Sequence, residues 1–203
     1  MADRDVTRTT TELLNALHDA SDDAAWLRFD VRYRPIIVGF ARSLGCDEAD
    51  AADVAQETLT RFVREYREGK YERERGRLRS WLLTIARYRV LDLRRHAARH
   101  PAMAAGTAIV NLEDEAELTV LWDREQRSAM LREALGQLRE TRTNEKTITA
   151  FELLVIQQQA AADVAEALDM TRHDVYVAKS RVTERLRGIM EELEAAYADV
   201  ATE

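Results

Sequence analysis

The chain of 203 residues contains only one cysteine, two prolines and seven glycines. One cysteine cannot form a disulfide within the chain, and it excludes a zinc site built from several cysteines. The scarcity of glycine and proline disfavours an all-β fold, which needs many tight turns. No apolar run reaches the roughly 18 residues of a membrane-spanning helix, and the first residues lack the apolar stretch of a signal peptide. We therefore expect a mostly helical protein of the cytoplasm.

Charge is abundant but unevenly distributed. Charged residues make up 33% of the chain, whose net charge is −7. Residues 61–100 carry 13 basic and 5 acidic side chains, residues 171–190 carry 5 and 2, and the segments around both are acidic. Two basic islands in an acidic chain indicate two surfaces for a polyanion. The alternative is that these arginines only cover solvated helices.

Apolar periodicity predicts an all-α fold. Helices are expected over 11–19, 22–44, 48–67, 78–96, from about 119, over 145–157 and over 161–168. Ser21, Asp22 and Asp47 are candidate N-caps, and Gly45 is a candidate helix stop. Pro35 should begin a new helix or kink one.

These helices are expected to form two small domains joined by a flexible linker. The predicted parts are an N-terminal domain (1–97), a linker (98–120), a C-terminal helix-turn-helix domain (121–190) and an acidic tail (191–203). The linker is predicted from its proline, glycine, alanines and acidic run.

The two sides of the predicted helix 78–96 differ in chemistry. One side carries Leu82, Leu83, Ala86, Val90 and Leu93, which should face the core. The opposite side carries Trp81, Thr84, Tyr88, Asp92 and Arg95. An exposed stripe with two aromatic rings and an arginine is more than solvation requires. The alternative is a second packing face against a neighbouring helix.

The segment 160–187 has the pattern of a helix-turn-helix. A short helix ends before Asp169, and Thr171 with Asp174 can cap the next helix reciprocally. Val175 and Val182 should face inward. The outer side carries Arg172, His173, Tyr176 and Lys179, where a recognition helix presents side chains to the major groove. A purely structural helical hairpin would share the apolar pattern.

Several motifs follow one another in a particular order. They are Tyr33-Arg34-Pro35, Asp53-Val54-Ala55-Gln56-Glu57, the run 77–87 with Ser80-Trp81-Leu82, the run 91–95, and Leu135-Gly136-Gln137-Leu138 before the helix-turn-helix. In this order the chain resembles bacterial RNA polymerase sigma factors of the extracytoplasmic-function (ECF) type, in the sigma-70 family. The resemblance covers about three quarters of the chain.

This resemblance implies a transcription initiation factor with two domains. The sequence contains no phosphate-cradling glycine loop, nucleophile elbow or zinc-protease pattern, so neither enzymatic activity nor a cofactor is expected. The N-terminal domain would bind the polymerase clamp and open the minus-ten element, and the C-terminal domain would read the minus-thirty-five element. Strand opening needs bases to be stacked and phosphates neutralised, which aromatic and basic side chains supply. The implied partners are core RNA polymerase and promoter DNA, and whether an anti-sigma protein also binds stays open.

The resemblance also assigns residues to each surface. The residues implied to bind the polymerase clamp are Asp53, Gln56, Glu57 and Arg61. Minus-ten DNA falls to Tyr71, Arg73, Arg75, Arg77, Arg79, Trp81, Tyr88, Asp92 and Arg95. Minus-thirty-five DNA falls to Thr171, Arg172, His173, Tyr176, Lys179 and Arg181. The segment from Tyr71 to Arg77 corresponds to the loop that captures a flipped-out base.

Other functions are less well supported by the residues. His96 and His100 could share a helix face, but they have no third ligand nearby, so no metal site is expected. The main alternative is a helix-turn-helix regulator with an N-terminal sensing or dimerisation domain. A helical adaptor that binds only protein is a further alternative. The basic island at 61–100, with its aromatic stripe, favours the sigma factor.

Overall fold

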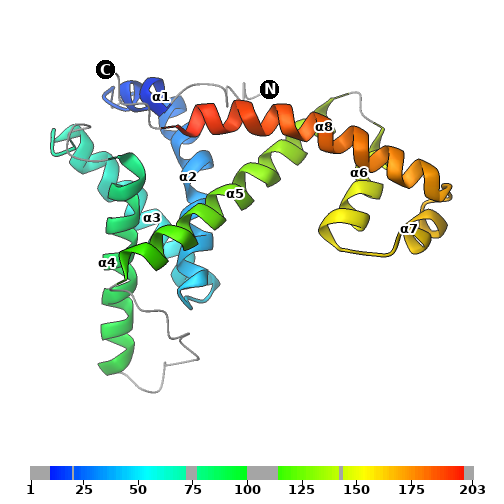
Figure 1. Ribbon diagram of the computed structural model, residues 1–203. Helices are drawn as coiled ribbons and strands as arrows, with labels where there is room; N and C mark the ends of the chain where they lie inside the picture. The colour runs from blue at the N-terminus through cyan, green and yellow to red at the C-terminus, as the bar shows by residue number, and fades with distance from the viewer. Residues whose placement is uncertain (1–9, 20, 72–76, 100–113, 142–143, 199–203) are drawn as a thin grey trace. The chain divides into compact units, whose positions relative to one another are not determined.

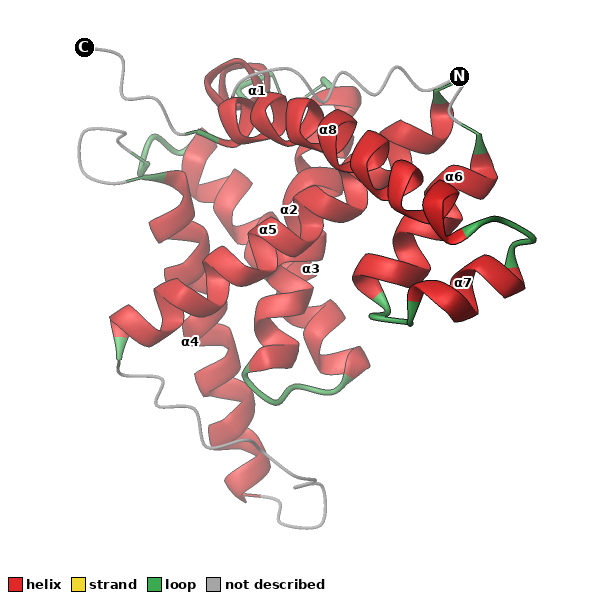
Figure 2. Ribbon diagram, turned by 45° about the vertical axis from the view of Figure 1, so that its right-hand side comes forward, coloured by secondary structure: helices red, strands yellow, loops and turns green. Residues whose placement is uncertain are grey.

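The computed structural model describes residues 10–19, 21–71, 77–99, 114–141 and 144–198. Every regular element in these ranges is a helix, as Figure 2 shows, so the all-α prediction is confirmed. In chain order the helices are α1 (Thr10–Ala16), α2 (Asp23–Ser43), α3 (Glu48–Arg67), α4 (Leu78–Arg99), α5 (Glu115–Glu140), α6 (Glu145–Phe151), the π-helix η3 (Glu152–Ile156), α7 (Ala161–Ala167) and α8 (Arg172–Tyr197). They fall into two compact units, residues 1–129 with 196–203 and residues 130–195.

Local sequence determines several helix ends. The Asp22 Oδ1 accepts the N–H of Ala25 at 2.8 Å, and the Asp47 Oδ1 accepts the N–H of Asp50 at 2.8 Å. Both aspartates therefore cap as predicted. Beyond the end of α2, Gly45 has a φ of 90°, a backbone conformation that favours glycine.

Pro35 does not begin a new helix, because α2 runs through it without interruption. The proline lies on the exposed side of α2, and Val31, whose carbonyl it deprives of a hydrogen bond, is also exposed. Water can serve that carbonyl. Ile36 and Ile37 are fully buried on the other side and fix the helix to the core.

The first unit is built around α2, α3 and α4, which pack against one another (Figure 1). Aromatic rings dominate their shared core: Phe29 stacks on Phe62 with centroids 5.2 Å apart, and Phe62 stacks on Tyr66 at 5.8 Å. The predicted inner side of α4 is buried at Leu82, Leu83, Ala86 and Val90 and partly buried at Leu93.

The amino-terminal part of α5 also belongs to the first unit. The helix begins at Glu115 rather than near 119, and Asp114 Oδ1 accepts the N–H groups of Ala116 and Glu117 at 2.9 and 3.1 Å. Leu118 and Trp122 are fully buried in the core of this unit. Residues 115–120, which were predicted to be part of the linker, are thus helical. The acidic side chains Glu115 and Glu117 suit the first turn of a helix, where negative charge is favourable. Pro101 and Gly106 lie outside the described residues.

The end of α8 completes the first unit. The Ala196 carbonyl accepts bonds from the Thr10 hydroxyl at 3.0 Å and the Arg32 Nη1 at 3.2 Å. The Tyr197 ring lies 6.0 Å from the Tyr33 ring, edge to face. Part of the predicted acidic tail is thus the last turns of a helix.

The second unit has a small core of its own. Its buried residues include Ala150, Val164, Ala165, Val175 and Ala178. They come from α6, α7 and α8. The helix predicted over 145–157 is divided, because the backbone changes to π-helix at Glu152 and Gln157 donates its N–H to the Glu152 carbonyl. Such π-turns occur often at functional sites.

Candidate functional site

The first candidate surface is the α3 polar face, which we define as Asp53, Gln56, Glu57 and Arg61. All four side chains are exposed and recur at helical spacing on α3. The other side of α3 is buried, with Val54, Ala55, Leu59 and Phe62 in the core. A shallow hollow of about 340 Å³ runs along this face and is lined by the four residues together with Thr60, Arg64 and Arg89.

Two arginines from neighbouring helices bind side chains of the α3 polar face. The Arg89 Nε of α4 lies 2.6 Å from the Glu57 Oε2, and the Arg34 Nη2 of α2 donates to the Gln56 Oε1 at 2.6 Å. Arg34 is itself fixed by a double hydrogen bond to Asp30. Sequence reasoning did not assign Arg34 or Arg89 to this surface, because their partners lie more than 20 positions away in the chain.

Glu65 links this face to α4. Its Oε1 accepts from the Arg61 Nε at 2.8 Å, and its Oε2 accepts from the Trp81 Nε1 at 3.1 Å. Sequence reasoning missed Glu65 as well. Its spacing of four residues from Arg61 was the available signal.

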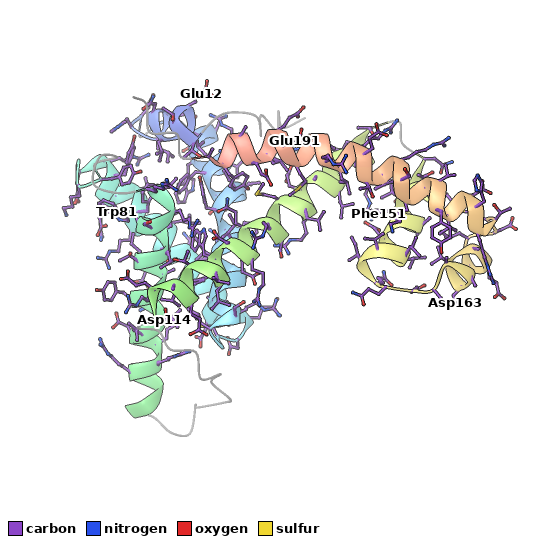
Figure 3. All side chains as sticks on the ribbon, viewed as in Figure 1. Glu12, Trp81, Asp114, Phe151, Asp163 and Glu191 are labelled. Carbon is purple, nitrogen blue, oxygen red and sulfur yellow. The ribbon has the colours of Figure 1, made fainter. Side chains whose placement is uncertain are left out.

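Two aromatic residues assigned to minus-ten DNA lie against the core. Tyr71 is only 8% exposed, and its ring packs against Phe62, Tyr66 and Trp81 at 5.1–5.9 Å. Trp81, which Figure 3 labels on α4, is partly buried against this core. The expectation that Trp81 lies on an exposed stripe, free of the core, is therefore wrong. The cause is α3, which packs beside α4 and gives this end of the stripe the second packing face considered above.

We define the α4 stripe as Trp81, Thr84, Tyr88, Asp92 and Arg95. Apart from Trp81, its residues are exposed. Tyr88 is 54% exposed, and Asp92 and Arg95 are also exposed, with a 3.4 Å ion pair between them. Arg77 is exposed just before α4. Arg79 is partly buried and paired with Asp123 of α5 at 2.8 Å. Arg73 and Arg75 lie outside the described residues.

The second candidate surface lies on α8. The reciprocal cap predicted at its start is confirmed: the Thr171 hydroxyl donates to the Asp174 Oδ2 at 2.6 Å, and the Asp174 N–H donates to the Thr171 Oγ1 at 3.1 Å. The hydrogen bonds from the Thr171 side chain and backbone lower the pKa of the Asp174 carboxyl. The cap fixes where α8 begins and hence which side chains face outward.

We define the recognition face as Arg172, His173, Tyr176 and Lys179. All four are exposed, whereas Val175, Ala178 and Val182 are buried on the opposite side. Tyr176 and Lys179 line a hollow of about 420 Å³ that continues to Ser180, Thr183, Glu184 and Arg187. Sequence reasoning missed Thr183 and Arg187, although their spacing from Tyr176 and Lys179 places them on the same side. Arg181 is exposed but does not line this hollow.

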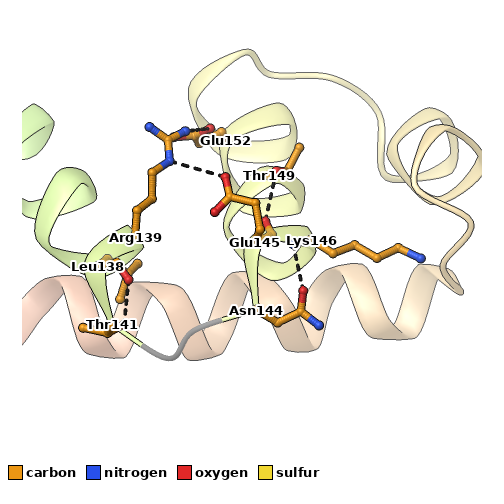
Figure 4. Close-up of polar contacts among 8 residues, drawn as sticks. All are labelled: Leu138, Arg139, Thr141, Asn144, Glu145, Lys146, Thr149 and Glu152. Atoms are coloured by element: carbon orange, nitrogen blue, oxygen red, sulfur yellow. Dashed lines mark hydrogen bonds and ion pairs between the residues drawn. The ribbon is translucent and has the colours of Figure 1, made fainter.

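Polar contacts within the second unit position the turn before α8. The Lys146 Nζ donates to the Asp169 carbonyl at 2.9 Å, and Asp169 has a φ of 47°, which aspartate tolerates. Figure 4 shows the neighbouring contacts, in which Arg139 binds Glu152 at 2.7 Å and lies 3.6 Å from Glu145. Lys146 thus joins α6 to the turn before α8, and Arg139 joins the end of α5 to α6 and η3.

The described residues contain no cluster of three or more potential metal ligands. Within the same part of the chain, no helix has the length and apolar character needed to cross a membrane.

Comparison with known proteins gives one family match. Residues 30–100 match the family model of sigma-70 region 2. No curated protein matches the chain. Among solved structures, the chain is similar to one described as the structure of CnrH in complex with the cytosolic domain of CnrY, with 19% identity, coverage of 94% of this chain and 98% of that chain, and a TM-score of 0.34. At this identity and TM-score, nothing about the present chain follows from that similarity.

The matched segment contains α3, α4 and most of α2, and with them the α3 polar face and the α4 stripe. It supports a sigma-factor role. Residues 30–100, about a third of the chain, are therefore similar to region 2 of the sigma-70 family.

Proposed function

We propose that this chain is a sigma factor of the ECF type that binds core RNA polymerase and directs promoter-specific transcription initiation. In this proposal the α3 polar face binds the polymerase clamp, the exposed part of the α4 stripe contacts the minus-ten strand, and the recognition face reads the minus-thirty-five duplex. The factor acts in the cytoplasm and catalyses no reaction itself.

One observation carries the proposal: the α3 polar face lies inside the segment that matches sigma-70 region 2. All four of its side chains are exposed, although α3 also contributes eight buried residues to the core. A helix that faces solvent on one side needs only varied polar residues there. A fixed set of pairs with Arg34 and Arg89 instead suits a surface whose side chains must keep one arrangement.

The recognition face supports the second half of the proposal. Its cations lie at the amino-terminal end of a helix that follows a tight turn, which is the part that enters the major groove in helix-turn-helix proteins. The α4 stripe supplies an exposed ring at Tyr88 for a stacked base.

The test is association of the full chain with bacterial core RNA polymerase, measured for the wild type, Glu57→Lys and Glu48→Lys. Glu57 is on the α3 polar face, whereas Glu48 is exposed nine residues earlier, about half a turn around the same helix. We expect Glu57→Lys to weaken association at least tenfold and Glu48→Lys to leave it nearly unchanged. Equal affinities for all three proteins would remove this face from the polymerase interface.

A DNA measurement separates the proposal from the regulator alternative. With a net charge of −7 and acidic segments beside both basic islands, the free chain should bind duplex DNA weakly. We expect promoter binding to require core polymerase. Tight binding of the free chain at physiological salt, with no gain from core polymerase, would favour the regulator.

A further inference from the structure

The amino-terminal part of α5, residues 115–129, is anchored in the first unit by apolar contacts. Leu118 and Trp122 are fully buried, and the Trp122 ring lies 5.6 Å from the Phe40 ring of α2, nearly edge to face. Loss of a buried tryptophan typically costs roughly 3–5 kcal/mol. This part of α5 is therefore a firmly attached component of the unit.

Acidic side chains flank this apolar anchor and contact α2 and α4. The Glu125 Oε1 accepts the Ser43 hydroxyl at 3.0 Å, and the Glu125 carboxylate lies so close to Gly39 that a side chain there would collide with it. The Asp123 Oδ1 lies 2.8 Å from the Arg79 Nη1. The segment thus presents carboxylates to a surface of the unit that contains part of the basic island.

Arg79 belongs both to this contact and to the residues that the resemblance assigns to minus-ten DNA, and we include it in the proposed minus-ten surface beside the α4 stripe. A guanidinium that pairs with a carboxylate uses the same N–H groups with which it would bind a phosphate. The side chains of Arg79 and Asp123 are 33% and 35% exposed, and pairs in such positions contribute only about 0–1 kcal/mol. A phosphate can therefore replace the Asp123 carboxylate while Trp122 keeps α5 in place.

We propose that Asp123 is an internal competitor of nucleic-acid phosphate for Arg79, so that α5 weakens DNA binding by this unit until other contacts fix the DNA. The inference rests on the proposed function, because it concerns regulation of the proposed minus-ten surface. It assigns a role to α5, whose first residues, 115–120, were predicted from the sequence to be part of the linker.

The test compares two variants that remove one negative charge from the same helix. Asp123→Asn frees Arg79, whereas Glu117→Gln changes an exposed residue that has no ion pair with a described residue. The measured quantity is the affinity of the full chain for a fluorescein-labelled single-stranded DNA of mixed sequence over a range of salt concentrations. Thermal unfolding of both variants checks that the fold is kept.

We expect Asp123→Asn to bind about threefold to tenfold more tightly than Glu117→Gln at low salt, as one added charge-assisted contact predicts. The slope of log K against log salt should steepen by about 0.7, which is the effect of one more neutralised phosphate on a single strand. The double variant Arg79→Gln/Asp123→Asn should lose this gain, because the released guanidinium is then absent.

Equal affinities and salt slopes for Asp123→Asn and Glu117→Gln would overturn the inference. It would also be overturned if neither variant bound the single-stranded DNA at the lowest salt concentration. Association with core polymerase is measured separately on the same proteins. If core polymerase fails to bind while Asp123→Asn still gains DNA affinity, the proposed function fails and the competition remains. If core polymerase binds and the two variants are equal, only the competition fails.

Discussion

Trp81 donates its indole N–H to the Glu65 Oε2 at 3.1 Å and so joins α4 to α3. The other carboxylate oxygen of Glu65 accepts from Arg61, a member of the α3 polar face. One glutamate therefore connects the proposed polymerase surface with the first residue of the α4 stripe. A change at Trp81 should affect both the stability of the first unit and the position of Arg61.

We expect Trp81→Ala to lower the free energy of unfolding by about 2 kcal/mol, below the roughly 3–5 kcal/mol of a fully buried tryptophan, because Trp81 is only partly buried. Trp81→Phe should keep most of the ring contact with Tyr71 and lose the hydrogen bond, at about 1 kcal/mol. Chemical unfolding measures both variants. Tyr88→Ala is the control, since surface changes usually stay within about 0.5 kcal/mol. Equal losses for Trp81→Ala and Tyr88→Ala would contradict the packing described above.

Tyr88 gives the cleaner test of DNA opening, because its ring is 54% exposed. Tyr88→Ala should leave folding and polymerase binding intact and weaken promoter melting, since stacking on an aromatic ring contributes about 1–3 kcal/mol per base. Permanganate reactivity of unpaired thymines in the promoter measures the open complex. Tyr88→Phe should behave as the wild type, and a template already mismatched at the minus-ten element should partly rescue Tyr88→Ala. Normal melting by Tyr88→Ala would show that the exposed ring is unused.

The ion pair between Glu57 and Arg89 should orient Glu57 more than it stabilises the fold. Exposed pairs contribute about 0–1 kcal/mol, and here the side chains are 53% and 32% exposed. We expect Arg89→Ala to unfold almost as the wild type does and to weaken binding to core polymerase about twofold to tenfold, less than Glu57→Lys. Arg89→Lys should retain part of the affinity. An unchanged dissociation constant for Arg89→Ala would show that Glu57 needs no partner from α4.

Lys179 and Arg181 should differ in their effect on duplex DNA. Lys179 lines the hollow on α8, whereas Arg181 lies two residues on, about 200° around the helix. If Lys179 binds a phosphate, Lys179→Ala should reduce the steepness of the salt dependence of holoenzyme binding by about 0.9. Arg181→Ala should leave it unchanged. A larger effect at Arg181 would place the recognition face on the other side of α8.

The cap at the start of α8 should depend on pH. Hydrogen bonds from Thr171 lower the pKa of Asp174. They therefore stabilise the cap fully at pH values above the ordinary pKa of aspartate. This contribution is lost as the pH falls through the lowered pKa. Thr171→Ala should raise the pKa of Asp174 toward its ordinary value, as NMR titration can measure, and should destabilise the start of α8 by about 1 kcal/mol. Thr171→Ser is the control, because it keeps the hydroxyl. An unchanged Asp174 titration in Thr171→Ala would contradict the cap.

Much of the local structure was predictable from the sequence. The bounds 48–67 are those of α3, and the caps at Asp22, Asp47 and Thr171 are those observed. Each depends on residues within one or two turns of each other, so periodicity and capping patterns suffice. The exposure of the α3 polar face follows from the same periodicity.

Contacts between distant helices were not predictable. The stripe on α4 has the same spacing at Trp81 as at Tyr88, yet Trp81 packs against Tyr71 and Glu65 while Tyr88 is exposed. Periodicity identifies a face but does not tell how far a neighbouring helix extends along it. The acidic composition before Leu118 likewise fits both a linker and a first helical turn, and only its burial decides between them.

The sequence by itself determined the all-α fold, most helix bounds, the turn before α8 and the exposure of the α3 polar face and of the recognition face, because each of these depends on side chains close together in the chain. Only the tertiary structure decided that Arg89 contacts Glu57, that Trp81 is bound to Glu65 and that Asp123 contacts Arg79. The residues of each pair lie on different helices and meet only because the apolar faces of those helices pack against each other. The free energy of that packing is spread over many buried contacts, and no local pattern specifies which charged side chains then meet at its edge.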